Sequence, residues 1–93
     1  MLALKDDAFT RNNYANVLRD SGKTEKAKAA YRQAIATDGA LVTPYINLAS
    51  LLISDGDIDA AKTLIEQGVV ATQGDDQARL QKFLSDLEAA GKG

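Results

Sequence analysis

The fold follows from two similar stretches of sequence, NYANVLRDSG at residues 13–22 and NLASLLISDG at residues 47–56. Their matching positions lie 34 residues apart, and the same spacing separates Ala27 from Ala61. A fixed period of this length is typical of proteins in which pairs of helices stack side by side. The sequence therefore predicts an array of helical pairs.

The composition bounds what such an array could do. The chain has 93 residues, enough for one domain and too few for two, and it contains neither cysteine nor histidine. It therefore has no disulfide framework and lacks the commonest general base and metal ligand. Its net charge is −2, whereas a nucleic-acid-binding surface is basic. We expect no nucleic acid partner and no cofactor.

Neither a membrane-spanning segment nor a signal peptide is visible. The longest apolar run, at residues 48–53, is far shorter than a membrane span, and charged residues follow the first four positions at once. We expect no membrane partner. The compartment stays unknown, with the cytoplasm favoured over secretion.

Glycines and helix-capping residues divide the chain into five expected helices. Their predicted bounds are about residues 7–21, 24–38, 43–55, 57–73 and 76–91. Thr24, Thr43 and Asp57 are the expected N-caps, with Pro44 in the first turn of the third helix. Because the connections are short, successive helices should run antiparallel.

Four of these helices show a clear apolar stripe at helical spacing, which predicts the core. The stripes consist of Tyr14, Ala15 and Leu18; Ala27, Ala30, Tyr31, Ala34 and Ile35; Ile58, Ala61, Leu64, Ile65 and Val69; and Leu80, Phe83, Leu84 and Leu87. Gly68 stands one period after Ala34. A glycine inside a helix costs about 1 kcal/mol relative to alanine. Gly68 is therefore either a point of close packing or simply tolerated.

These residues resemble the tetratricopeptide repeat family, in about two and a half repeats. In that family the first helix carries an aromatic, a leucine, a small residue and another large residue, and the second carries alanine, an aromatic and alanine, after a glycine turn. The matching residues are Arg11, Tyr14, Ala15, Leu18, Gly22, Ala27, Tyr31 and Ala34 in repeat one; Tyr45, Leu48, Ala49, Leu52, Gly56, Ala61, Ile65 and Gly68 in repeat two; and Leu80, Phe83, Leu84, Leu87 and Gly91 in a half repeat.

The resemblance implies an all-α, right-handed superhelix of five antiparallel helices in a single domain over residues 1–93. Repeat one would cover about residues 8–41, repeat two about 42–75, and a capping helix or half repeat about 76–91. Two features depart from the family pattern: Arg11 replaces the usual aromatic, and the proline that closes each repeat is absent. The fifth helix is either a terminal cap or the start of a further repeat.

The resemblance also implies where a ligand would bind, because first helices line the concave face in this family. The expected groove residues are Phe9, Asn12, Asn13, Asn16, Arg19, Ile46, Asn47, Ser50 and Ile53. On the fifth helix the matching positions are Ala78, Gln81, Ser85 and Glu88, bordered by Lys82. Asparagine suits a peptide groove because its amide both donates and accepts hydrogen bonds. Asn13 and Asn47 resemble the asparagine ladder with which some family members hold a peptide backbone. Asn16 and Asn47 also match two positions of the carboxylate clamp, with which other members bind a peptide C-terminus. That clamp needs a lysine at the position where this chain has Asn12.

Each groove residue also has an ordinary interpretation. A polar stripe opposite the core is what any surface helix shows, and asparagine is common at these positions whatever the ligand. Ile46 and Ile53 are either ligand contacts or packing residues between neighbouring helices. If they are contacts, Asn47→Ala and Ile46→Asp should weaken partner binding without loss of helix.

We see no catalytic arrangement, so we expect a non-enzyme. Asp55, Asp57 and Asp59 lack the flanking residues of a cation-binding loop and fit a capped turn. Three functions remain open: a module that binds a protein or peptide partner in its groove, a structural segment that self-associates through its terminal helices or stacks in a longer array, and an RNA-binding repeat, which the acidic charge disfavours.

Overall fold

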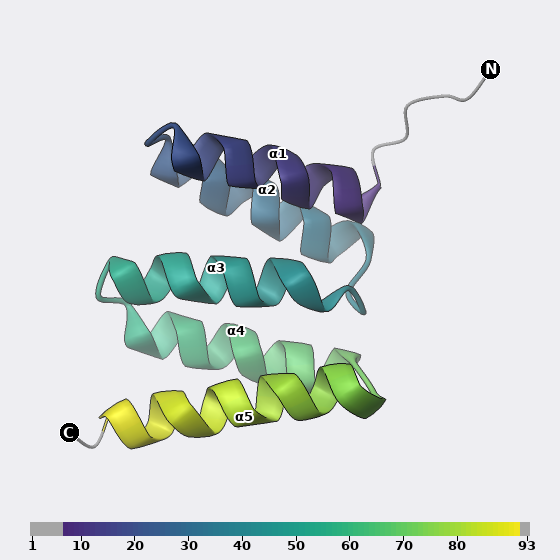
Figure 1. The fold of residues 1–93 in the computed structure, drawn as a ribbon, viewed down its shortest axis with the longest axis vertical. Coiled ribbons are helices and arrows are strands. Elements are labelled where there is room, and N and C mark those ends of the chain that lie inside the picture. Colours follow the sequence, from purple (N-terminus) through teal and green to yellow (C-terminus); the bar gives the residue numbers. More distant parts are fainter. Residues whose placement is uncertain (1–6, 92–93) are drawn as a thin grey trace.

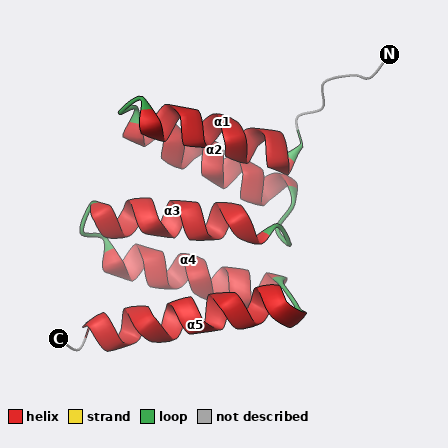
Figure 2. Ribbon diagram, viewed as in Figure 1, coloured by secondary structure: helices red, strands yellow, loops and turns green. Residues whose placement is uncertain are grey.

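The computed structural model describes residues 7–91, and this part of the chain consists of helices joined by short turns (Figures 1 and 2). The helices are α1 (Ala8–Asp20), α2 (Thr24–Thr37), α3 (Val42–Ser54), α4 (Ile58–Ala71) and α5 (Gly74–Gly91). No strand occurs in this described part. The predicted all-helical repeat fold with five helices is confirmed.

The helices form a stack in two layers. Figure 1 shows α1, α3 and α5 in the nearer layer and α2 and α4 behind them, with successive helices running in opposite directions. Within each repeat α1 packs on α2 and α3 on α4, while α2 packs on α3 across the repeat boundary and α5 covers α4. The helices α1 and α3, and also α3 and α5, touch more lightly. The face made by α1, α3 and α5 is called the odd-helix face below.

The two repeats turn in the same way because a glycine occupies the same position in each. Gly22 and Gly56 have φ values of 82° and 83°, in the left-handed region that glycine enters at little cost. After each glycine the chain folds back: the Lys23 N–H donates to Leu18 O at 2.9 Å, and the Asp57 N–H donates to Leu52 O at 2.8 Å. The 34-residue period of the sequence therefore corresponds to the same backbone conformation repeated at both turns.

The helix starts are only partly as predicted. The Asp57 carboxylate accepts from the Ala60 N–H at 3.2 Å, which confirms it as an N-cap. Thr24 is the first residue of α2 instead of its cap, and α3 begins at Val42, before Thr43. The earlier start of α3 keeps Pro44 within the first turn, where its missing N–H breaks no helical hydrogen bond.

The core runs along the stack between the two layers. Its largest fully buried side chains are Tyr31, Leu48, Ile65, Leu80 and Pro44. Nearly all residues of the predicted stripes belong to this core or pack against it. The prediction for Tyr14 is wrong, because its side chain is 60% exposed whereas its counterpart Leu48 is fully buried. Leu48 is covered because α2 packs on α3, and among residues 7–91 no helix packs on the outer side of α1.

Close packing explains the glycine inside α4. A Cβ atom at Gly68 would lie 2.8 Å from Leu80 Cδ1 and 2.9 Å from Tyr45 Cδ1. Both distances are shorter than a carbon–carbon contact allows. Gly68 therefore lets α3, α4 and α5 approach one another at one point, which decides between the two interpretations of this residue.

Candidate functional site

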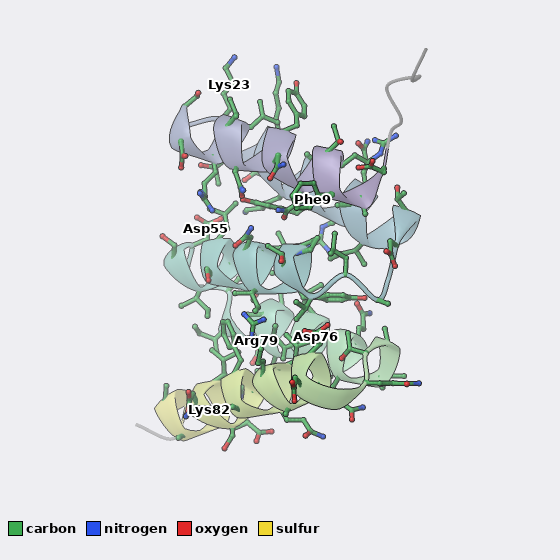
Figure 3. The ribbon with its side chains drawn as sticks, turned by 45° about the vertical axis from the view of Figure 1, so that its right-hand side comes forward. Phe9, Lys23, Asp55, Asp76, Arg79 and Lys82 are labelled. Atoms are coloured by element: carbon green, nitrogen blue, oxygen red, sulfur yellow. The ribbon has the colours of Figure 1, made fainter. Side chains whose placement is uncertain are left out.

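A hollow on the odd-helix face lies between α3 and α5. It has a volume of about 440 Å³ and is lined by Ile46 from α3 and by Arg79, Lys82, Phe83, Asp86 and Leu87 from α5. Ile46, Phe83 and Leu87 form an apolar floor that is continuous with the core. Charged side chains form the rim, and Figure 3 shows Arg79 on the side of α5 nearer α3. We call this feature the α3–α5 hollow.

The basic groups near this face are accompanied by carboxylates. Arg79 lies 4.0 Å from Asp76, and Lys82 lies 3.9 Å from Asp86. On α1 the Arg19 guanidinium lies 3.1 Å from the carboxylate of Asp20. The local charge is therefore close to balanced, which favours a neutral or mixed ligand over a strongly anionic one.

Beside the hollow, side chains of α1, α2 and α3 form a hydrogen-bonded cluster, which we call the asparagine cluster. The Asn47 Nδ2 group donates to Asn12 Oδ1 and to Asn16 Oδ1, each at 3.2 Å. The Tyr31 hydroxyl also donates to Asn16 Oδ1, and Arg19 donates to the Tyr31 hydroxyl at 3.1 Å. The cluster thus joins the two repeats through polar side chains.

Burial shapes the chemistry of this cluster. Tyr31 is fully buried, and desolvation raises the pKa of its hydroxyl, an effect that the nearby Arg19 guanidinium partly opposes. The hydroxyl therefore stays protonated and available as a donor to Asn16.

Tyr45, outside this cluster, is a second buried tyrosine of the same kind. Desolvation raises the pKa of its hydroxyl, which donates to Gly39 O at 2.7 Å. Both tyrosines are structural hydrogen-bond donors.

The predicted groove residues fall into three groups. Phe9, Asn13 and Ser50 are exposed, and Asn16, Arg19, Ile46, Asn47 and Ile53 are partly buried. Asn12 is only 3% exposed and its Oδ1 accepts a hydrogen bond from Asn47. Little of the Asn12 side chain is therefore open to a ligand, because it takes part in the hydrogen-bonded contact between α1 and α3.

Sequence reasoning identified only part of the hollow. The sequence places Ile46 in the expected groove, with Lys82 or Arg79 as the basic residues that α5 could supply there. It gives no signal for Asp86, and its periodicity assigns Phe83 and Leu87 to the core alone. The positions expected on α5, Ala78, Gln81, Ser85 and Glu88, are exposed but do not line the hollow.

A second hollow lies on the opposite side, between α2 and α4. Its volume is about 310 Å³, and it is lined by Arg32, Asp59, Ala60, Thr63, Leu64 and Gln67. Its lining is more polar than that of the α3–α5 hollow, and no apolar floor of comparable extent lies beneath it.

Lys28 in α2 forms ion pairs that link this helix to the α3–α4 turn. Its ammonium group pairs with Asp55 in that turn and with Glu25, the latter at 3.1 Å. Hydrogen bonds to these two carboxylates raise the pKa of Lys28.

Residues 7–91 carry neither a metal-binding cluster nor a membrane-spanning helix. They contain no group of three or more acidic, histidine or cysteine side chains placed to hold a metal ion. None of the helices described is long and apolar enough to cross a membrane.

Comparison with known proteins gives one result. A search of the curated proteins found no significant match, and neither did a search of the solved structures. The family model of the tetratricopeptide repeat matches residues 18–87, which include all of α2, α3 and α4 and most of α5. Members of this family are generally protein–protein interaction modules and typically non-catalytic. Since the match covers well over half of the chain, this protein belongs to the tetratricopeptide repeat family.

Proposed function

We propose that this chain is a non-catalytic adaptor that binds a peptide segment or a helix of a partner protein on its odd-helix face. The observation that carries the proposal is the α3–α5 hollow, where an apolar floor meets a charged rim at the surface. Sites for specific ligands are usually concave and mostly apolar, with a few polar groups that fix orientation. No other hollow described in residues 7–91 combines these features to the same degree.

The hollow suits an apolar side chain of the partner. Its volume of about 440 Å³ can take one large side chain or two smaller ones. The side chains of Lys82, Asp86 and Arg79 are 81%, 70% and 62% exposed, so they are free to reorient around an incoming group. An anchor residue on the floor with polar contacts at the rim is the arrangement that gives most binding energy in small interfaces.

The rest of the partner would extend from the hollow towards α1. The proposed contacts are the exposed or partly buried groove residues, namely Phe9, Asn13, Asn16, Arg19, Ile46, Asn47, Ser50 and Ile53. Asn12 is left out because it is buried. The Asn47 Nδ2 group is already used within the asparagine cluster, so the Oδ1 atom is the part of this side chain offered to a ligand.

A protein partner is favoured over nucleic acid by the charges on this face. Arg19, Arg79 and Lys82 each lie within 4.0 Å of a carboxylate. Binding a phosphate backbone would require these carboxylates to be displaced, and affinity for nucleic acid depends on unbalanced positive charge. We therefore propose no nucleic acid partner.

A selected peptide can test the site without knowledge of the natural partner. Peptides that bind the immobilised chain would be selected from a displayed random library and titrated by calorimetry. We expect Lys82→Glu to weaken binding at least about fivefold, a change of roughly 1 kcal/mol. Lys26→Glu, the same substitution at an exposed position on α2, is the matched control and should bind normally.

Methyl resonances locate the peptide independently. The methyl signals of Ile46 and Leu87 should shift during the titration, whereas those of Val70, which is 86% exposed on α4, should not. Peptides that leave the Ile46 and Leu87 signals in place, or that bind Lys82→Glu and Lys26→Glu equally well, would show that the hollow is not the site.

A further inference from the structure

The outer side of α1 carries a stripe of uncharged side chains, which we call the end stripe. It consists of Thr10, Asn13, Tyr14 and Val17, spaced as one face of a helix. All four are exposed, Tyr14 at 60% and Val17 at 62%, and Phe9 borders the stripe at 64%. Of the four large hydrophobic side chains that are exposed among the described residues, three therefore lie on or beside this stripe.

The repeat shows what such a stripe does elsewhere in the same molecule. One period later the corresponding residues of α3 are Pro44, Asn47, Leu48 and Leu51. Pro44 and Leu48 are fully buried and Leu51 is partly buried, because α2 packs on α3. The end stripe thus has the spacing and apolar content of a helix–helix interface.

We propose that a second copy of this chain covers the end stripe, with α1 of one copy packed on α1 of the other about a twofold axis. A twofold contact places the same surface on both sides, so a single apolar stripe is sufficient for both partners. The end stripe does not line the α3–α5 hollow, and only Asn13 and the bordering Phe9 are shared with the proposed groove contacts. The pairing therefore depends on Tyr14 and Val17, which the function proposed above does not use.

Charge favours pairing of α1 with itself. The end stripe carries no charged side chain, and residues 7–20 hold two arginines and two aspartates, so two such helices do not repel each other. At the other end of the stack, α5 exposes charged residues that include Arg79, Lys82, Asp86 and Glu88. An uncharged α1 packed on this side of α5 would remove charged side chains from water and offer them no new partner, a cost that is absent when two end stripes meet. Head-to-head pairing is therefore favoured over head-to-tail stacking.

The area of the stripe sets the strength of the contact. Phe9, Tyr14 and Val17 together expose on the order of 350 Å² per copy, given the size of aromatic side chains. With the flanking polar atoms, two copies would bury about 1,000 Å², which lies below the range of stable interfaces. We expect a reversible dimer with a dissociation constant on the order of 100 μM, typical of weak interfaces.

Sedimentation equilibrium over a concentration series tests this pairing. Between about 10 μM and about 1 mM, the mass should rise from 9.9 kDa towards twice that value and no further. Val17→Glu should keep the protein monomeric throughout, because it places a carboxylate in each half of the contact. Val70→Glu, the same substitution at an exposed position of α4, is the control and should dimerise like the parent chain.

Cysteine cross-linking tests the orientation, since the chain has no cysteine of its own. Asn13→Cys should form a disulfide-linked dimer under mild oxidation far faster than Ser85→Cys, which lies on the exposed side of α5. A parent chain that stays monomeric at about 1 mM, or masses that grow beyond a dimer, would overturn the proposal. Equal responses of the two glutamate variants, or of the two cysteine variants, would do the same.

Discussion

Gly68 shows how one missing side chain determines the spacing of three helices. Its position in the period corresponds to Ala34, yet a methyl group at Gly68 would meet both Tyr45 and Leu80. The Tyr45 ring cannot easily move away, because its hydroxyl donates to Gly39 O at 2.7 Å and its side chain is only 2% exposed. The glycine is thus required by packing, against the helix propensity of this position.

Gly68→Ala should therefore destabilise the protein, although alanine is the better helix former. Overpacking costs about 1–3 kcal/mol and the gain in propensity is about 1 kcal/mol, so we expect a net loss of up to about 2 kcal/mol in the free energy of unfolding. Urea denaturation measures this change.

Gly39→Ala is the matched control for this substitution. A Cβ atom at Gly39 would lie 3.6 Å from Tyr45 Oη and 3.7 Å from Ile35 O, which are ordinary contact distances. Its free energy of unfolding should change by less than about 0.5 kcal/mol. A Gly68→Ala variant as stable as Gly39→Ala would mean that the Tyr45 ring yields without cost.

At the scale of helices, the asparagine cluster joins α1 to α3 where their backbones touch only lightly. Asn47 supplies both hydrogen bonds across this boundary, to Asn12 and to Asn16. Asn12 is buried, so the loss of its partner would leave a polar oxygen away from water. Asn47 is therefore a structural residue in addition to its proposed place in the groove.

Asn47→Ala should lower the free energy of unfolding by about 1–3 kcal/mol, the cost of leaving a buried acceptor unpaired. Asn13→Ala, on an exposed side chain of the same type in α1, should change it by less than about 0.5 kcal/mol. In a double-mutant cycle with Asn12→Ala, the combined loss should be smaller than the sum of the single losses. Strict additivity would show that the hydrogen bond between Asn12 and Asn47 contributes nothing.

At the scale of the whole molecule, the stack has a centre and two different ends. The central helix α3 packs on α2 and α4 and also touches α1 and α5, whereas each end helix is covered on one side only. In such linear arrays stability depends on contacts between neighbours. The middle of the stack should therefore be its most stable part.

Amide hydrogen exchange can measure this gradient. The amides in the middle of α3 should exchange more slowly than those in the middle of α1 and α5, by at least about tenfold. At high protein concentration the exchange of α1 should slow selectively if the proposed dimer forms, and Val17→Glu should abolish that effect. Equal exchange rates in all five helices would instead indicate one cooperative unit.

Much of this architecture could be predicted from the sequence, because it depends on local chemistry repeated at a fixed period. The spacing of Gly22 and Gly56 and the alanines of the second helices predicted the helical pairs, their turns and most of the core. Tyr14 is exposed although the sequence predicts it in the core, because the position of a helix in the stack, and not the residue type, determines burial. The same repeat position is buried in α3 and exposed in α1.

The sequence by itself determined the helices, the turns and the family, since helical period and glycine conformation act over only a few residues. Only the tertiary structure showed that Asn12 is buried, that Asn47 bridges two repeats, and that α5 presents Arg79 and Asp86 beside Ile46. Those features depend on the rotation and distance between helices that are far apart along the chain. A change of a few ångströms in helix packing, which no local pattern encodes, is enough to move a side chain from the surface into a contact.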